Sequence, residues 1–156
     1  MKRSLLLVLT AALLGLGLLA GCGGDDGPSQ KDEFDTAFNK VNTDFVKLGE
    51  DVQQTIQTAE GKPDDELATK FKSLSDQVLA IKARLTGLDA PGEYSKDVDR
   101  LAASMQVVAV DLGEIAEAAE NGQAAEAKSQ VQELVRHSVE TRTARRALAR
   151  KTGAET

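Results

Sequence analysis

Residues 64–88, DDELATKFKSLSDQVLAIKARLTGL, decide the fold of this chain. Their apolar side chains alternate at spacings of four and three residues, which is the period of one face of an α-helix. That face consists of Leu67, Phe71, Leu74, Val78, Ile81, Leu85 and Leu88. Gly61 and Pro63 precede the stretch and Pro91 follows it, and both residue types interrupt helices. We predict Asp64 as the N-cap, because an Asp side chain accepts hydrogen bonds from first-turn N–H groups.

Three further apolar stripes with helical spacing lie on either side of this stretch. The first contains Phe34, Phe38, Val41, Phe45, Leu48, Val52, Ile56 and Ala59. The third contains Tyr94, Val98, Leu101, Met105, Val108, Leu112, Ile115 and Ala119, and Asn121-Gly122 ends it. The fourth is the least regular, with Ala127, Val131, Leu134 or Val135, Ser138 or Val139, Thr141 and Leu148. Four amphipathic helices of similar length are therefore expected.

The helices are joined by short breaks at near-equal spacing, which predicts an all-α, up-down-up-down four-helix bundle over residues 31–152, followed by a tail at 153–156. Each helix would run for about 24 to 30 residues, or roughly 36–45 Å. With 3% aromatic residues and no Trp, the composition suits helices packed through aliphatic side chains. An extended coiled coil that dimerises is the alternative, and the equal spacing of the breaks favours folding back within one chain.

The N-terminus has the pattern of a processing segment. Lys2 and Arg3 form a basic start, and residues 5–19 form an apolar core. Beyond it, the sequence contains no stretch of 18 or more apolar residues that predicts a membrane span. We interpret residues 1–21 as a signal peptide.

Four residues follow that apolar core: Leu19, Ala20, Gly21 and Cys22. They resemble the lipobox of bacterial lipoproteins. The resemblance implies that the signal peptide is cut between Gly21 and Cys22, and that the Cys22 sulfur carries diacylglycerol. Two or three acyl chains would hold the protein stably on the cell membrane, facing outside the cytoplasm. An uncleaved anchor helix and an ordinary secretory signal are the alternatives, and the latter would leave a lone free cysteine.

Residues 22–30 are rich in Gly, Asp and Ser and predict a flexible tether behind the lipid. The whole pattern is similar to small helical lipoproteins of actinobacteria, many of which have no assigned function. The break at residues 88–91 and the Asn121-Gly122 turn contribute to that similarity. This similarity implies a function for one residue only, Cys22.

Charge is distributed unevenly along the mature chain. Residues 136–156 carry six basic and two acidic side chains, a net charge of +4, within a chain whose net charge is −6. Antiparallel topology places this segment beside the start of the first helix. Its cluster of Arg142, Arg145, Arg146, Arg150 and Lys151 would then either touch anionic headgroups or complement the helix dipole and pair with Asp32, Glu33 and Asp35.

The residues that would support chemistry at a metal or catalytic centre are sparse. His137 is the only histidine and Cys22 the only cysteine, so the Glu-x-x-His pairs of di-iron bundles are excluded and a zinc site is disfavoured. Met105 and His137 lie at comparable distances from the Gly122 turn, which leaves haem as a minor possibility. We expect no enzyme activity and no cofactor, and the acidic, aromatic-poor chain disfavours nucleic-acid binding.

The leading interpretation is therefore a non-enzymatic interaction or scaffold module of the cell envelope, docking onto an envelope protein of unknown identity. The alternative is a carrier or sensor that binds a small apolar ligand or haem between the helices. Gly49 and Gly113 lie within predicted helices. They would mark close helix approach, a groove, or simple tolerance of glycine.

Overall fold

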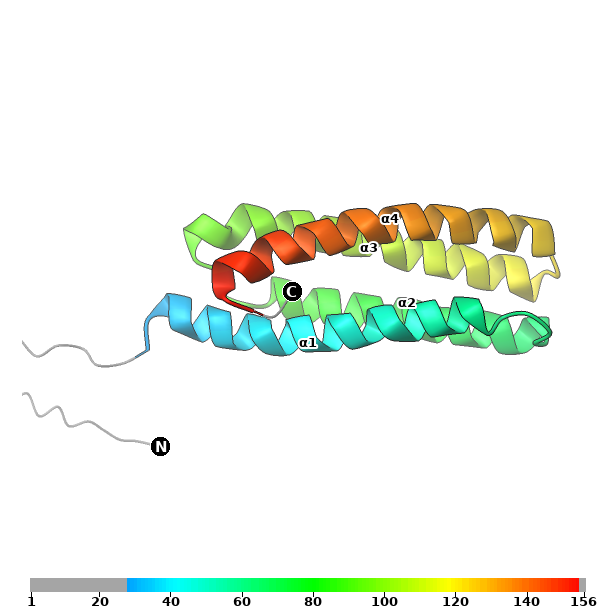
Figure 1. The fold of residues 1–156 in the computed structure, drawn as a ribbon, viewed down its shortest axis with the longest axis horizontal. Helices are drawn as coiled ribbons and strands as arrows, with labels where there is room; N and C mark the ends of the chain where they lie inside the picture. Colours follow the sequence, from blue (N-terminus) through cyan, green and yellow to red (C-terminus); the bar gives the residue numbers. More distant parts are fainter. Residues whose placement is uncertain (1–27, 155–156) are drawn as a thin grey trace, which may run out of the picture.

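The computed structural model describes residues 28–154, which form four helices in one antiparallel bundle (Figure 1). The helices are α1 (Gln30–Gln57), α2 (Asp64–Thr86), α3 (Gly92–Glu120) and α4 (Ala124–Thr152). This confirms the predicted four-helix bundle. None of the helices in residues 28–154 is apolar over a length that would cross a bilayer.

The helix boundaries follow local capping chemistry. The Ser29 hydroxyl accepts a hydrogen bond from the Asp32 backbone N–H, and the Asp32 carboxylate accepts one from the Ser29 backbone N–H, which completes a capping box at the start of α1. The prediction of Asp64 as an N-cap is wrong. Pro63 occupies that position without a side-chain hydrogen bond, and Asp64 is the first residue of α2, because proline's fixed φ suits the extended backbone there.

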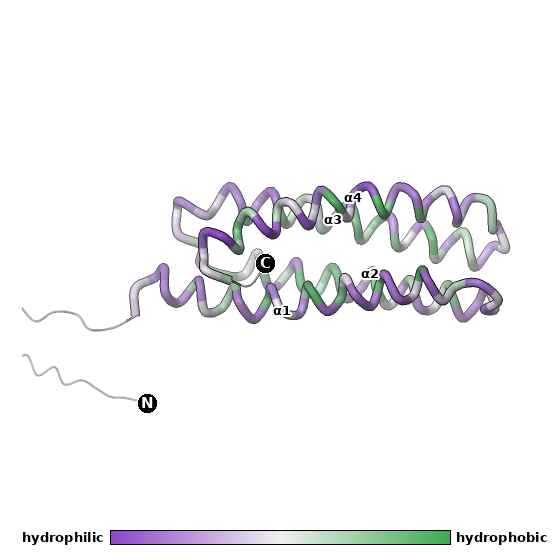
Figure 2. Tube along the Cα trace, viewed as in Figure 1, coloured by the Kyte–Doolittle hydropathy of each residue, from purple (hydrophilic) through white to green (hydrophobic). Residues whose placement is uncertain are grey.

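The core contains the predicted stripes of α2 and α3 almost completely. All eight stripe residues of α3 are buried, as are five of the six that lie in α2; the seventh predicted residue, Leu88, follows the end of that helix. Figure 2 shows the corresponding hydrophobic stripe along the inner sides of the helices. In α4 the buried stripe contains Leu134, which is 1% exposed, and not Val135, which is 53% exposed. Ala144, Leu148 and Ala149 then continue the buried face toward the C-terminus.

Helix α3 packs closely against α2 and α4, whereas α1 has the least intimate packing of the four. On α3, Ala102, Ala109 and Ala116 are buried at intervals of seven residues. Small side chains let helix backbones approach, and the Ser75 hydroxyl of α2 reaches the Ala109 carbonyl of α3 at 2.7 Å. The buried side chains of α1 include the larger Phe34 and Phe38.

Three aromatic side chains join α1 to the bundle near its start. The rings of Phe34 and Phe38 lie 6.0 Å apart, and the rings of Phe34 and Tyr94 lie 5.4 Å apart. Such ring pairs add stabilisation beyond their buried area. The beginning of α1 is therefore the better anchored part of that helix.

The two interior glycines do not mediate close helix packing. A Cβ atom added at Gly49 or at Gly113 would meet nothing within 4 Å. This excludes the close-approach alternative for these glycines, because both positions face open space.

One end of the bundle contains the start of α1, the α2–α3 connection and the end of α4 (Figure 1). We call it the tether end, and the opposite end the far end. At the tether end, α4 finishes with Gly153 in the left-handed conformation, and the Ala154 N–H donates to the Ala149 carbonyl. This is the Schellman pattern, and the buried Ala154 supplies its apolar contact.

Candidate functional site

The predicted lipidation site and signal cleavage site lie outside the described residues. Gly21 and Cys22 both precede residue 28, where the description begins. The predicted basic cluster lies wholly within the described part, and the structure divides its five members into two groups. Two of them contact other helices, and three have no ion-pair partner among the described residues.

Arg145 belongs to the first group and is only 5% exposed. Its Nη1 donates to the Asn42 Oδ1 of α1 at 2.8 Å. Burial lowers the pKa of the guanidinium, and the neighbouring charges of Arg146 and Arg142 lower it further. A buried charge needs hydrogen-bond acceptors, so Arg145 acts as a polar link between α4 and α1.

Lys151 is exposed, but it contacts α3. Its ammonium group forms an ion pair with Asp97, and its carbonyl accepts a hydrogen bond from the Tyr94 hydroxyl at 3.3 Å. Lys31 of α1 lies over the Tyr94 ring, 5.2 Å from the ring centroid. Three helices therefore meet at Tyr94, at the tether end of the bundle.

The acidic groups at the start of α1 make local contacts. Asp35 forms an ion pair with Lys31 at 2.6 Å, and that hydrogen bond raises the pKa of the Lys31 ammonium. Asp32 is held by Ser29 in the capping box. None of the ion pairs found in residues 28–154 joins the basic cluster to Asp32, Glu33 or Asp35.

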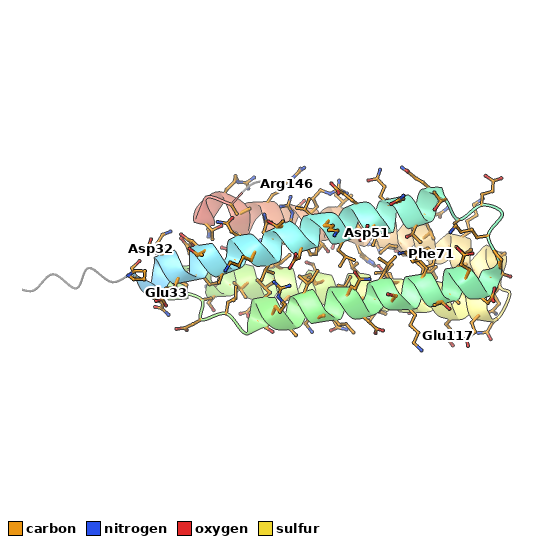
Figure 3. The ribbon with its side chains drawn as sticks, turned by 90° about the horizontal axis from the view of Figure 1, so that it is seen from below. Asp32, Glu33, Asp51, Phe71, Glu117 and Arg146 are labelled. Atoms are coloured by element: carbon orange, nitrogen blue, oxygen red, sulfur yellow. The ribbon has the colours of Figure 1, made fainter. Side chains whose placement is uncertain are left out.

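Arg142, Arg146 and Arg150 form the second group, and all three are exposed. In Figure 3, Arg146 lies at the outer edge of α4 in the tether-end half, while Glu117 of α3 lies at the opposite edge toward the far end. Among the described residues none of these three arginines has an ion-pair partner. Their charges are therefore available at the surface.

His137 has a specific structural partner. Its Nδ1 lies 2.7 Å from the Oδ2 of Asp111, a carboxylate that is 5% exposed. The sequence pattern missed this pair because Asp111 falls outside the apolar stripe of α3. A buried carboxylate requires such a partner, so the pair joins α3 to α4 at mid-length.

The register of α3 against α4 separates Met105 from His137. Asp111 lies opposite His137. Asp97 and Lys151 also lie opposite each other, and each is fourteen residues nearer the tether end of its helix. In that register Met105 falls six residues from the level of His137, or about 9 Å along the axis. The expectation that the two share a level is wrong, which removes the geometric argument for haem.

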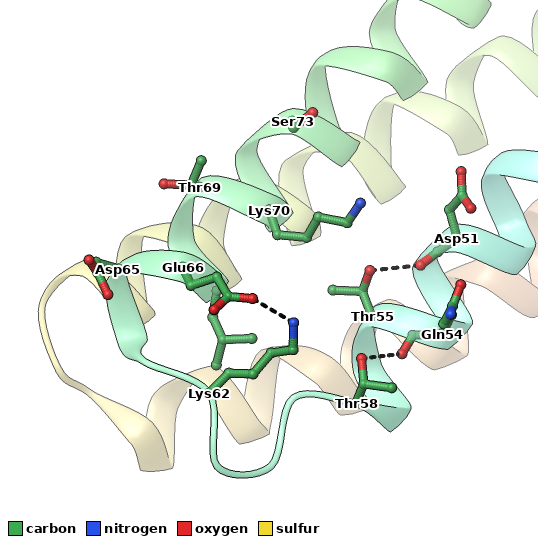
Figure 4. A pocket seen from close by; sticks show the side chains of 11 residues that line it. Asp51, Gln54, Thr55, Thr58, Lys62, Asp65, Glu66, Thr69, Lys70 and Ser73 are labelled. Carbon is green, nitrogen blue, oxygen red and sulfur yellow. Dashed lines mark hydrogen bonds and ion pairs between the residues drawn. The ribbon is translucent and has the colours of Figure 1, made fainter.

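A groove with a volume of about 600 Å³ lies between α1 and α2 (Figure 4). It begins near the far end, where the α1–α2 connection closes it. Its walls are polar and include both charges: Asp51, Gln54, Thr55, Thr58, Lys62, Asp65, Glu66, Leu67, Thr69, Lys70 and Ser73. A second hollow of about 300 Å³ continues along the same pair of helices and shares Asp51.

Part of the groove wall is fixed and part is available for binding. The Thr55 hydroxyl donates to the Asp51 carbonyl at 2.7 Å, the Thr58 hydroxyl donates to the Gln54 carbonyl, and Lys62 pairs with Glu66. Figure 4 shows the Lys70 ammonium and the Asp51 carboxylate directed at the space between the helices, with no ion pair joining them. The wall thus offers both a donor and an acceptor to a bound group.

Sequence reasoning did not predict this groove, since it depends on how far α1 stands from α2. The available signal was the run of polar residues at helical spacing, Asp51, Thr55 and Thr58, on the flank of the α1 stripe. Such a run is also typical of an ordinary solvated face. Its position beside the polar residues of α2 emerges only from the packing.

Groups of three or more His, Cys, Asp or Glu side chains placed to hold a metal ion do not occur within residues 28–154. Comparisons of the chain with known protein families, with curated proteins and with solved structures give no match.

Proposed function

We propose that this chain is a lipid-anchored protein of the cell envelope that works as a non-enzymatic interaction module, with the α1–α2 groove as its docking surface for a partner protein. The lipobox residues Gly21 and Cys22 support the anchor. The groove supports the docking role. In this proposal the tether end is the end joined to the lipid anchor, and the groove lies in the half of the bundle away from that anchor, where a partner has access to it.

The observation that carries the docking role is the mixed-charge wall of the groove, in which Lys70 and Asp51 have no ion-pair partner among the described residues. Lys70 and Asp51 lie on opposite helices and face the same open space. A polypeptide segment offers donors and acceptors along its whole length, so it can satisfy both groups. The wall is too polar for an apolar ligand, because burying unsatisfied polar groups is costly.

Photo-crosslinking in living cells tests the docking role. A photoreactive amino acid is placed at Ser73, in the groove, and in a matched variant at Glu117, which is exposed on the outer face of α3. We expect a discrete adduct from position 73, none from position 117, and loss of the adduct when Lys70→Glu is added. Equal adducts from both positions, or recovery of the chain alone from both, would refute the groove as the docking surface.

Metabolic labelling with an alkyne fatty acid tests the anchor separately. The label should appear on the chain and disappear in Cys22→Ser, because Cys22 is the only cysteine. A label that persists in that variant, or that never appears, would refute lipidation of Cys22. Neither result changes the interpretation of the crosslinks.

A further inference from the structure

Arg142, Arg146 and Arg150 continue a stripe of exposed side chains that begins with Val135 and Val139. Successive members are four, three, four and four residues apart, so they follow one side of α4 over about 22 Å. The two valines are 53% and 55% exposed. We call these five residues the α4 flank.

The acidic residues of α4 lie on other sides of the helix. Glu126, Glu133 and Glu140 repeat every seven residues, and at 100° per residue Glu140 lies about 160° around the helix from Arg142. Glu133 is moreover paired with Arg136. The α4 flank is therefore purely basic and apolar, a combination typical of surfaces that lie in a membrane interface.

The two halves of the bundle differ in charge. Residues 30–44, 76–106 and 138–154 form the tether-end half and carry eleven basic and ten acidic side chains. Residues 45–75 and 107–137 form the other half and carry six basic and twelve acidic side chains. An anionic surface therefore attracts the tether-end half more than the far half, and the arginines of the α4 flank all lie in the tether-end half.

From the α4 flank we infer that the bundle rests sideways on the bilayer, with Arg142, Arg146 and Arg150 on anionic lipid headgroups and Val135 and Val139 at the acyl boundary. This inference rests on the proposed membrane anchor. Residues 22–29 can reach at most about 28 Å when extended, enough for the bundle to lie down beside its lipid. The position of the valines distinguishes this pose from an upright one, because an upright bundle would hold them away from the bilayer.

Fluorescence quenching tests the pose. In the lipidated chain Cys22 is blocked, so Val139→Cys provides the single free thiol for a fluorophore, and Glu117→Cys provides the matched control. Both are reconstituted in vesicles of phosphatidylcholine, alone or mixed with phosphatidylglycerol, containing a lipid-borne quencher. We expect quenching at position 139 only in the anionic vesicles, its loss in the triple variant R142E/R146E/R150E, and none at position 117. Quenching at 139 that ignores lipid charge or the arginines, or that is absent from anionic vesicles, would overturn the inference.

Two controls separate other outcomes. If the fluorescence of the label at position 139 changes with the amount of protein per vesicle in neutral vesicles, a second copy of the chain covers the flank. That result would overturn the assignment of the flank to lipid. The chain from residue 22 onward with Cys22→Ser, verified as helical by circular dichroism, tests the flank without an anchor. Each arginine changed to alanine should lower its partition onto anionic vesicles about fivefold. A partition insensitive to these changes would refute the flank, whatever the state of Cys22.

Discussion

The seam between α2 and α3 and the seam between α1 and α2 are built from different residues. The first is lined by alanines of α3, and its helices approach closely enough for the Ser75 hydroxyl to bond the Ala109 carbonyl. The second has mostly polar side chains at its surface, and a groove runs along it. Small residues let backbones meet, whereas large ones hold them apart and leave room for another molecule.

The difference in packing between the two seams indicates which helices stabilise the bundle and which border its groove. Helices α2, α3 and α4 form the tightly packed body, and α1 is attached to it through the core residues Phe34, Phe38, Val41 and Leu48 and through the Asn42–Arg145 hydrogen bond. The part of α1 from Asp51 onward borders the groove, and Asp44, Lys47 and Leu48 border the second hollow. A docking partner can therefore bind without disrupting the body of the bundle.

The largest expected effect is on the aromatic attachment of α1. Phe38→Ala removes a side chain that is 1% exposed, so we expect the free energy of unfolding to fall by about 3–5 kcal/mol. The matched change Val52→Ala, in the half of α1 beside the groove, should cost less than about 1.5 kcal/mol because Val52 is only partly buried. Urea unfolding measures both. Equal losses would show that α1 is attached evenly along its length.

A single enlarged side chain compares the two seams directly. Ala109→Leu should destabilise the protein by about 1–3 kcal/mol, because the α2–α3 seam has no room for it. Ala80→Leu, in the wall of the smaller hollow between α1 and α2, should change the unfolding free energy by less than about 0.5 kcal/mol. Thermal unfolding of both variants checks this, and similar losses would refute the difference in packing.

Adding a methyl group to α1 should stabilise it. Gly49→Ala places a Cβ in open space within a helix, so we expect a gain of about 0.5–1 kcal/mol in unfolding free energy. Gly122→Ala is the control, because that residue has φ +65° and an alanine there should destabilise the protein by about 1–2 kcal/mol. A loss of stability at Gly49 would mean that the glycine is needed for the geometry of α1.

The smallest effect concerns the capping box. Hydrogen bonds from the side chain and backbone of Ser29 lower the pKa of Asp32 below its ordinary value of 3.8. The capping contribution should be complete above pH 3.8 and should disappear as the pH falls through the lower folded-state pKa. Asp32→Asn should therefore differ from the native chain in melting temperature at neutral pH and converge with it in strong acid. A difference that does not change with pH would contradict this assignment.

The sequence predicted the helices and most of the core because α2 and α3 keep a strict apolar period. It could not choose between Leu134 and Val135, since both are apolar and adjacent, and the choice depends on where neighbouring helices lie. It also placed Arg145 in a surface cluster, because its burial depends on Asn42, 103 residues away. The groove was unpredictable for the same reason, since it reflects helix separation and not residue pattern.

Hydrogen–deuterium exchange, read residue by residue, tests most directly whether the α1–α2 seam is the weakly packed one. We expect the amides of residues 44–57 in α1 to open with a lower free energy than those of residues 101–116 in α3, and Phe38→Ala to extend the low values to all of α1. Equal opening free energies in all four helices would show a single cooperative unit, and would contradict a separable α1 and the docking role that depends on it.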